Sequence, residues 1–73
     1  MPKLPRISGE EAARAFQRAG WEVARQRGSH VVLVKEGSIY TLSIPMHESL
    51  GPGLLRDQIR KAGLTIEEFI RLL

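Results

Sequence analysis

The tripeptide Gly28-Ser29-His30 has the clearest potential for chemistry, because it places a histidine where a turn feeds an apolar strand. Histidine is the side chain whose unperturbed pKa places its change of charge between pH 5 and 8. Held where a flexible turn meets a rigid strand, such a group is both accessible and well aimed, as proton transfer in RNA cleavage requires. Taken alone, the same pattern is more often a surface histidine that follows a turn, so the rest of the sequence must decide.

RNA cleavage requires a proton to leave the 2′-hydroxyl, charge to be stabilised on the phosphoryl group, and a proton to reach the 5′-oxygen. His30 could perform one of the two proton transfers, which is worth about 10²–10⁴-fold in rate. Ser29 and His47 are candidate accessory groups, although serines beside glycine often serve the turn and loop histidines are commonly surface residues. The nearest cationic side chains in the sequence, candidates for phosphate binding, are Arg25, Arg27 and Lys35.

Length and composition narrow the class of protein. A chain of 73 residues predicts a single domain over residues 1–73, with a small core. The absence of cysteine excludes disulfides and thiolate zinc sites, and the adjacent pair His47-Glu48 makes a poor ligand set, so we expect neither a metal nor a cofactor. No segment approaches the ~18 apolar residues of a membrane helix, and no signal-peptide core is present, so we expect a cytoplasmic protein.

The charge is unevenly distributed along the chain. The net charge is +3 and the sequence pI is about 10.0. Residues 1–35 carry seven Lys and Arg against three acidic residues, whereas residues 36–73 carry four against five. This asymmetry is a weak indication that the first half binds a polyanion, and ordinary surface charge explains it about as well.

Capping boxes predict where two helices begin. In the first, the Ser8 hydroxyl can accept from the N–H of Glu11 while the Glu11 carboxylate reaches back. Thr65 and Glu68 repeat the pattern at a short final helix. The apolar residues expected to face the core are Ala12, Ala15, Phe16 and Ala19 in the first helix, Leu55, Ile59 and Ala62 in the second, and Leu64 with Phe69 at the last.

Three strands are predicted between the first two helices, over residues 21–26, 30–35 and 38–44. A tight turn at Glu36-Gly37 joins the second strand to the third, and Pro45 ends the third. The resulting order is α-β-β-β-α with a short C-terminal helical extension. This order is typical of an α+β two-layer sandwich, in which helices cover one face of an antiparallel sheet.

The expected hairpin register decides which way His30 points. A loop centred on Glu36-Gly37 pairs residues whose numbers sum to 73, so His30 lies opposite Ser43. His30 then belongs to a mixed, open face and is exposed, unless a bulge near Gly37 exchanges the two faces. The residues expected on the buried, apolar face are Val31, Leu33, Tyr40, Leu42 and Ile44.

Several short blocks, in this order and spacing, resemble the HicA family of toxins over nearly the whole chain. Each block alone is weak, whereas the ordered set is specific. Leu54 departs from the family pattern, in which a threonine often precedes the leucine of the second helix. The blocks are Pro2-Lys3-Leu4-Pro5, Ser8-Gly9, Gly20-Trp21, Gly28-Ser29-His30, Ile44-Pro45-Met46-His47, Pro52-Gly53-Leu54-Leu55, Ile59 and Ala62-Gly63-Leu64.

The resemblance implies a double-stranded-RNA-binding-domain-like fold and the activity of a small mRNA interferase. It also implies that the activity depends on His30 and that a HicB-type antitoxin holds the toxin in check. We therefore expect a metal-independent endoribonuclease that acts on mRNA, with no membrane association and no DNA binding without the antitoxin. The alternative is a non-catalytic RNA-binding module on the same fold, since many small α+β domains bind without catalysing.

RNA binding is expected to depend on phosphates rather than bases, because the four aromatic residues all occupy predicted core positions. These residues are Phe16, Trp21, Tyr40 and Phe69. The cations of the second helix, Arg56, Arg60 and Lys61, either touch phosphate or form a solvated face, and the neighbouring Asp57 favours the solvated face.

Overall fold

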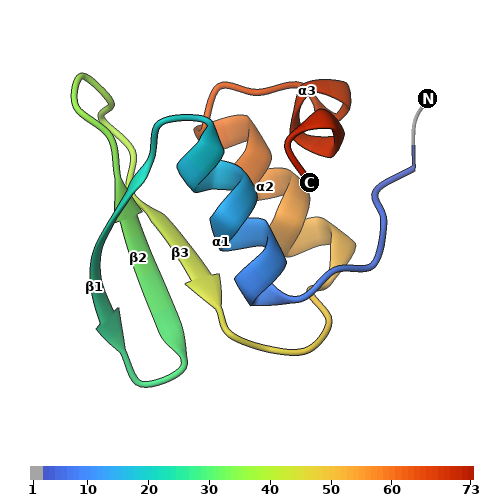
Figure 1. Ribbon diagram of the computed structural model, residues 1–73, viewed down its shortest axis with the longest axis horizontal. Helices are drawn as coiled ribbons and strands as arrows, with labels where there is room; N and C mark the ends of the chain where they lie inside the picture. Colours follow the sequence, from blue (N-terminus) through green and yellow to red (C-terminus); the bar gives the residue numbers. More distant parts are fainter. Residues whose placement is uncertain (1–2) are drawn as a thin grey trace.

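The computed structural model describes residues 3–73 and shows six elements in the predicted order (Figure 1). Pro2, which opens the first block of the resemblance, lies outside the described residues. The elements are α1 (Gly9–Arg18), β1 (Glu22–Arg27), β2 (His30–Val34), β3 (Leu42–Pro45), α2 (Pro52–Lys61) and α3 (Ile66–Arg71).

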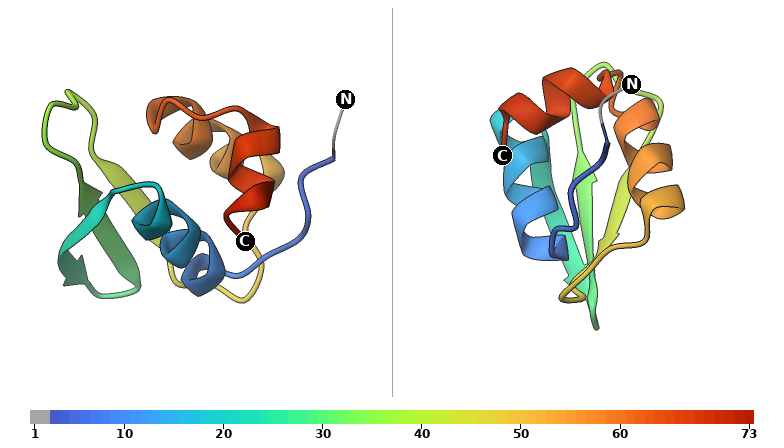
Figure 2. Two further views of the ribbon diagram at one scale, coloured as in Figure 1. Left: turned by 45° about the horizontal axis from the view of Figure 1, so that its top comes forward. Right: turned by 90° about the vertical axis from the view of Figure 1, so that its right-hand side faces the viewer.

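The three strands form one antiparallel sheet in the order β1-β2-β3, and all three helices lie on the same side of it (Figure 2). The predicted α+β sandwich is therefore confirmed, and it is compatible with a double-stranded-RNA-binding-domain-like fold. Within residues 3–73, no helix is long and apolar enough to cross a bilayer.

Both predicted capping boxes are present. The Ser8 hydroxyl accepts a hydrogen bond from the backbone N–H of Glu11 at 3.1 Å, and the Glu11 carboxylate accepts from the N–H of Ser8 at the same distance. Thr65 and Glu68 repeat this exchange at α3, at 3.0 and 2.9 Å. The two boxes satisfy backbone donors that would otherwise remain unpaired at these helix starts.

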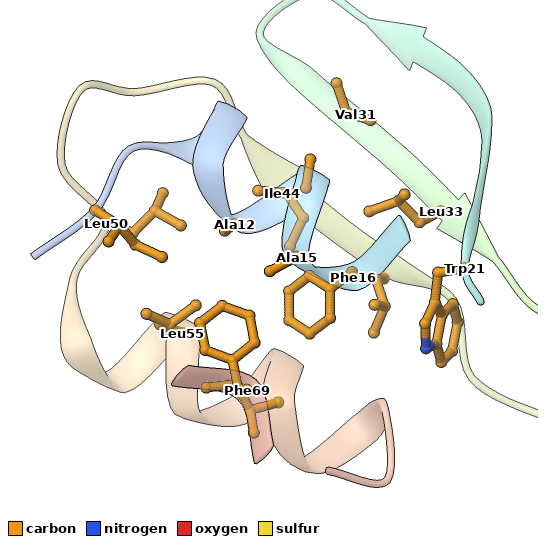
Figure 3. Close-up of a cluster of buried hydrophobic side chains, with 14 residues drawn as sticks. Ala12, Ala15, Phe16, Trp21, Val31, Leu33, Ile44, Leu50, Leu55 and Phe69 are labelled. Atoms are coloured by element: carbon orange, nitrogen blue, oxygen red, sulfur yellow. The ribbon is translucent and has the colours of Figure 1, made fainter. Parts of the chain in front are cut away.

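The core lies between the sheet and the helices, around two aromatic rings (Figure 3). The ring centroids of Phe16 and Phe69 are 5.0 Å apart with the rings tilted by 43°, a favourable offset geometry. Trp21 is also buried, as predicted. The sheet side of the core consists of Val31, Leu33, Leu42 and Ile44, the predicted inner face without Tyr40.

The predicted register of the β2–β3 hairpin is wrong by two residues. His30 pairs with Pro45 rather than Ser43, and Leu33 pairs with Leu42, so paired numbers sum to 75 instead of 73. The turn explains the difference: the N–H of Ser38 donates to Lys35 O at 3.0 Å, and Gly37 has φ +86°. Gly37 is the third residue of the turn Lys35–Ser38, and a positive φ at this position is a feature of type II turns. Because such turns splay the flanking strands, pairing begins only at Leu42.

A shift of two residues leaves the inside–outside alternation unchanged. His30 therefore keeps its predicted face and is exposed, whereas Leu42 and Ile44 remain fully buried. Tyr40 is the exception: it precedes β3, and its side chain is 49% exposed, so its predicted core position is wrong.

Gly9 allows the start of α1 to lie directly against the end of β3. A Cβ atom on Gly9 would lie 1.9 Å from Pro45 O and 2.9 Å from the Cα of Met46. The N–H of Gly9 also donates to His47 O at 2.9 Å. Because the obstructing atoms are backbone, any side chain at this position would force the helix and the strand apart.

This contact predicts opposite effects for two glycine substitutions. Gly9→Ala should destabilise the protein by about 1–3 kcal/mol through overpacking, whereas Gly53→Ala, also in the first turn of a helix but with open space at its Cβ, should be neutral or mildly stabilising. Thermal or urea unfolding followed by circular dichroism measures both. A Gly9→Ala protein as stable as the Gly53→Ala protein would contradict this account of the contact.

Candidate active site

His30 is the first residue of β2 and directly follows the two-residue turn of the β1–β2 hairpin. Gly28 has φ +58°, and no residue other than glycine has a positive φ in the described chain, so the signs match a type II′ turn. Such turns follow the natural twist of the strands, which lets pairing continue up to His30. The next residue, Val31, is buried against the helices, and this fixes the imidazole of His30 on the opposite, open face.

Two arginines share that open face with His30. Arg27 pairs with His30 across the hairpin, and Arg25 pairs with Val32 after a bulge at Val23/Arg25. Residues directly opposite in an antiparallel pair have Cβ atoms about 4.5–5.5 Å apart, and diagonal neighbours lie within reach of long side chains. The structure therefore places Arg27 and Arg25 on the same face of the sheet as His30.

Neither arginine is occupied by an acidic partner. Within residues 3–73 the ion pairs are Arg14–Glu10, Arg60–Asp57 and Lys61–Asp57, so Arg25 and Arg27 take part in none of them. Both side chains are exposed. Two guanidinium groups beside an exposed imidazole form a positive site, and the carboxylate of β1, that of Glu22, lies at the opposite end of the hairpin, where it pairs with Val34.

Two contacts that the sequence did not indicate hold the turn in place. The side chain of Gln26 donates to Gly28 O at 3.2 Å, and the N–H of Met46 donates to Ser29 O. Gln26 belongs to no motif, and the Met46 contact depends on the hairpin register. Together they tie the turn before His30 to both neighbouring strands.

Ser29 lies next to His30 within the turn and is exposed. Its carbonyl is occupied by Met46, and in residues 3–73 its hydroxyl makes no hydrogen bond to protein. The hydroxyl is thus free to meet a ligand beside the imidazole.

His47 lies near the same end of the sheet, but on its helix side. It lines a shallow hollow with Ser8, Glu10, Gln26, Met46 and Glu48, and His30 does not contribute to that lining. Gln26 pairs with the buried Val31, which places this hollow on the inner side of the sheet. The structure therefore does not bring the two histidines into one pocket.

Lys35 lies away from His30. It follows the opposite end of β2, about 17 Å along the strand at roughly 3.3 Å per residue. Its ammonium group donates to Ala19 O at 3.0 Å, at the C-terminal end of α1. There it satisfies a helix carbonyl, a favourable place for a cation.

Two of the three cations of α2 pair with an acidic residue of the same helix, Asp57. Arg60 and Lys61 approach the Asp57 carboxylate at 2.7 and 3.1 Å. Hydrogen bonds from Lys61 and then Arg60 lower the pKa of Asp57 below its ordinary value. Arg60 and Lys61 thus have an acidic neighbour on their own helix, unlike Arg25 and Arg27.

The arrangement around His30 can move a proton and hold a phosphate, but it offers no metal ligand set. Among residues 3–73, no three His, Cys, Asp or Glu side chains cluster as metal ligands would. One exposed imidazole with two free guanidinium groups fits acid–base chemistry on a phosphodiester.

Comparison with known proteins assigns a family to this fold and site. The family described as HicA toxin of bacterial toxin–antitoxin matches residues 9–64, which include every strand, α2 and the Gly28-Ser29-His30 turn. No curated protein matches the chain significantly.

Proposed function

The chain belongs to the HicA family of toxins from bacterial toxin–antitoxin systems, and we propose that it is an endoribonuclease that cleaves mRNA with His30 as general acid or base. The observation that supports the proposal most directly is that the imidazole of His30 is exposed and that His30 lies opposite Arg27, which has no acidic partner in residues 3–73. We extend the proposal to the whole of residues 1–73 as one toxin domain.

The proposed reaction uses the nucleophile that RNA itself contains. The 2′-oxygen attacks the adjacent phosphorus, the bond from phosphorus to the 5′-oxygen breaks, and a 2′,3′-cyclic phosphate and a 5′-hydroxyl result. One proton leaves the 2′-oxygen and one reaches the 5′-oxygen. His30 performs one transfer and water performs the other. Ser29, next to His30 in the chain, can hydrogen-bond the phosphate, whereas His47 lines a hollow to which His30 does not contribute.

Arg27 and Arg25 supply the positive charge that the phosphoryl group needs as it gains charge in the transition state. Guanidinium groups suit this role because they present several N–H donors in a rigid fork. Lys35, held at the far end of β2, would touch RNA only away from the cleavage point.

His30→Ala and His30→Gln should each reduce cleavage of single-stranded RNA by about 10²-fold or more, because the proton-transfer group is lost. Folding should be little affected, since the side chain of His30 is exposed. A gel assay of RNA cleavage, with circular dichroism melts of the same proteins, measures both. If the His30→Ala protein cuts RNA at the wild-type rate, the mechanism is wrong. If neither the wild-type protein nor the His30→Ala protein cuts RNA, but both bind it, the non-catalytic alternative holds.

Two substrate and solvent controls belong to the same assay. RNA methylated at the 2′-oxygen should resist cleavage, since the internal nucleophile is blocked, and continued cleavage would point to attack by water. Cleavage should continue in EDTA, because the proposed steps require no metal.

Arg27→Ala should weaken binding to all single-stranded RNA sequences by a similar factor. Each phosphate contact adds about −0.7 to the slope of log affinity against log salt, so loss of one contact should flatten the slope by that amount. Arg71→Ala on α3 is the matched control, because it removes the same charge from an exposed side chain on the helix side of the molecule. Equal effects of the two variants would show that only net charge matters.

We further propose that the antitoxin is of the HicB type and neutralises the toxin by covering the open face around His30. Acidic groups of the antitoxin would then lie opposite Arg25 and Arg27, and added salt should slow association. Hydrogen exchange or a structure of the complex should show this face protected. A complex in which His30 stays accessible to solvent and RNA would contradict this mode of inhibition.

A further inference from the structure

Tyr40 lies in a second cationic hollow, far from His30. The hollow is lined by Tyr40, Arg60 and Lys61, where the β2–β3 loop passes beside the last turn of α2 (Figure 2). Tyr40 is the chain's single tyrosine and is 49% exposed. It thus differs from Phe16, Trp21 and Phe69, which are all buried in the core.

The backbone of Tyr40 is held in place. Its N–H donates to the Ser38 hydroxyl at 3.1 Å, and that hydroxyl donates to Tyr40 O at 3.4 Å. The same Ser38 closes the turn through its N–H bond to Lys35 O. These hydrogen bonds hold the backbone that carries the Tyr40 ring, which lowers the entropy cost of binding a ligand to the ring.

The two cations in the hollow keep donors free although both pair with Asp57. The Arg60 side chain is 81% exposed and that of Lys61 is 36% exposed. A guanidinium has five N–H donors and an ammonium three, whereas each group makes one hydrogen bond or ion pair to Asp57 here. Both can therefore also receive a phosphate.

We propose that this hollow is a second binding point for the RNA strand, in which a base stacks on Tyr40 and the adjoining phosphate contacts Arg60 and Lys61. The inference rests on the proposed ribonuclease function. An exposed aromatic ring beside cations is the combination with which proteins bind single-stranded nucleic acid. Binding of a protein partner to this hollow is a separate outcome of the test below.

The distance between His30 and the Tyr40 hollow separates RNA affinity from the chemical step. Tyr40 lies beyond Leu42, the first residue of β3, which is three residues or about 10 Å along the strand from Pro45, the partner of His30, at roughly 3.3 Å per residue. The hollow therefore holds the strand away from the bond that is cut. It should contribute to affinity for RNA and not to the chemical step.

The test measures binding of a fluorescent single-stranded RNA by anisotropy, with all variants carrying His30→Ala so that the RNA stays intact. Tyr40→Ala should lower affinity by about five-fold or more, the range for loss of one stacked base, whereas Tyr40→Phe should retain it. Ile39→Ala is the matched control, because Ile39 is the adjacent residue and is 90% exposed but has no ring to stack.

An abasic strand of the same length separates stacking from charge, because it retains every phosphate and lacks the bases. The Tyr40→Ala effect should disappear on this strand, while Arg60→Ala should still weaken binding. In proteins with His30 intact, Tyr40→Ala should raise KM and leave kcat nearly unchanged. A dinucleotide too short to span the two sites should be cleaved equally well by both proteins.

The outcomes distinguish this inference from the proposed function. Normal RNA affinity in Tyr40→Ala, or an equal loss in Ile39→Ala, overturns the second site while cleavage by His30 stands. Normal RNA affinity with weakened antitoxin binding assigns the hollow to the protein partner and likewise overturns the inference. If His30→Ala cleaves like the wild type, the proposed function fails whatever Tyr40 does.

Discussion

The backbone contact between Gly9 and the end of β3 is the constraint on which the position of His30 depends. Here the start of α1 meets Pro45 and Met46 so closely that no side chain fits between them. Pro45 is also the residue opposite His30 in the sheet. The packing of the helix layer is thereby transmitted directly to the strand that flanks the histidine.

Backbone hydrogen bonds extend this contact in both directions. Gly9 N–H bonds to His47 O, Leu50 N–H bonds to Ile7 O, and Met46 N–H bonds to Ser29 O. The chain before α1, the segment after β3 and the β1–β2 turn are therefore joined at one end of the molecule. An exposed histidine on a hairpin tip would ordinarily be mobile, and these bonds give it a defined place without burying it.

The two faces of the sheet differ in role and in charge. Its inner face is covered by helices and carries the core, while its outer face leaves His30 and the two arginines of β1 open. Elsewhere, cations satisfy neighbouring groups: Lys35 bonds a carbonyl at the end of α1, and Arg14 pairs with Glu10. Arg25 and Arg27 have no ion-pair partner in residues 3–73 and lie on the same face as His30, and these two properties together make them candidates for binding phosphate at the site of cleavage.

Local rules were sufficient for much of the molecule. The capping boxes at Ser8 and Thr65 and the alternation of Val31 and Leu33 predicted the helix starts and the exposure of His30, because each depends on neighbours within a few residues. The turn at Gly37 sets the register of β2 and β3; it is a local feature, but the residue types Glu36-Gly37 did not specify which turn forms. The separation of His30 from His47 and the exposure of Tyr40 were decided by tertiary structure, because they depend on how the end of β3 and α2 pack, and these contacts join residues that are distant in the sequence.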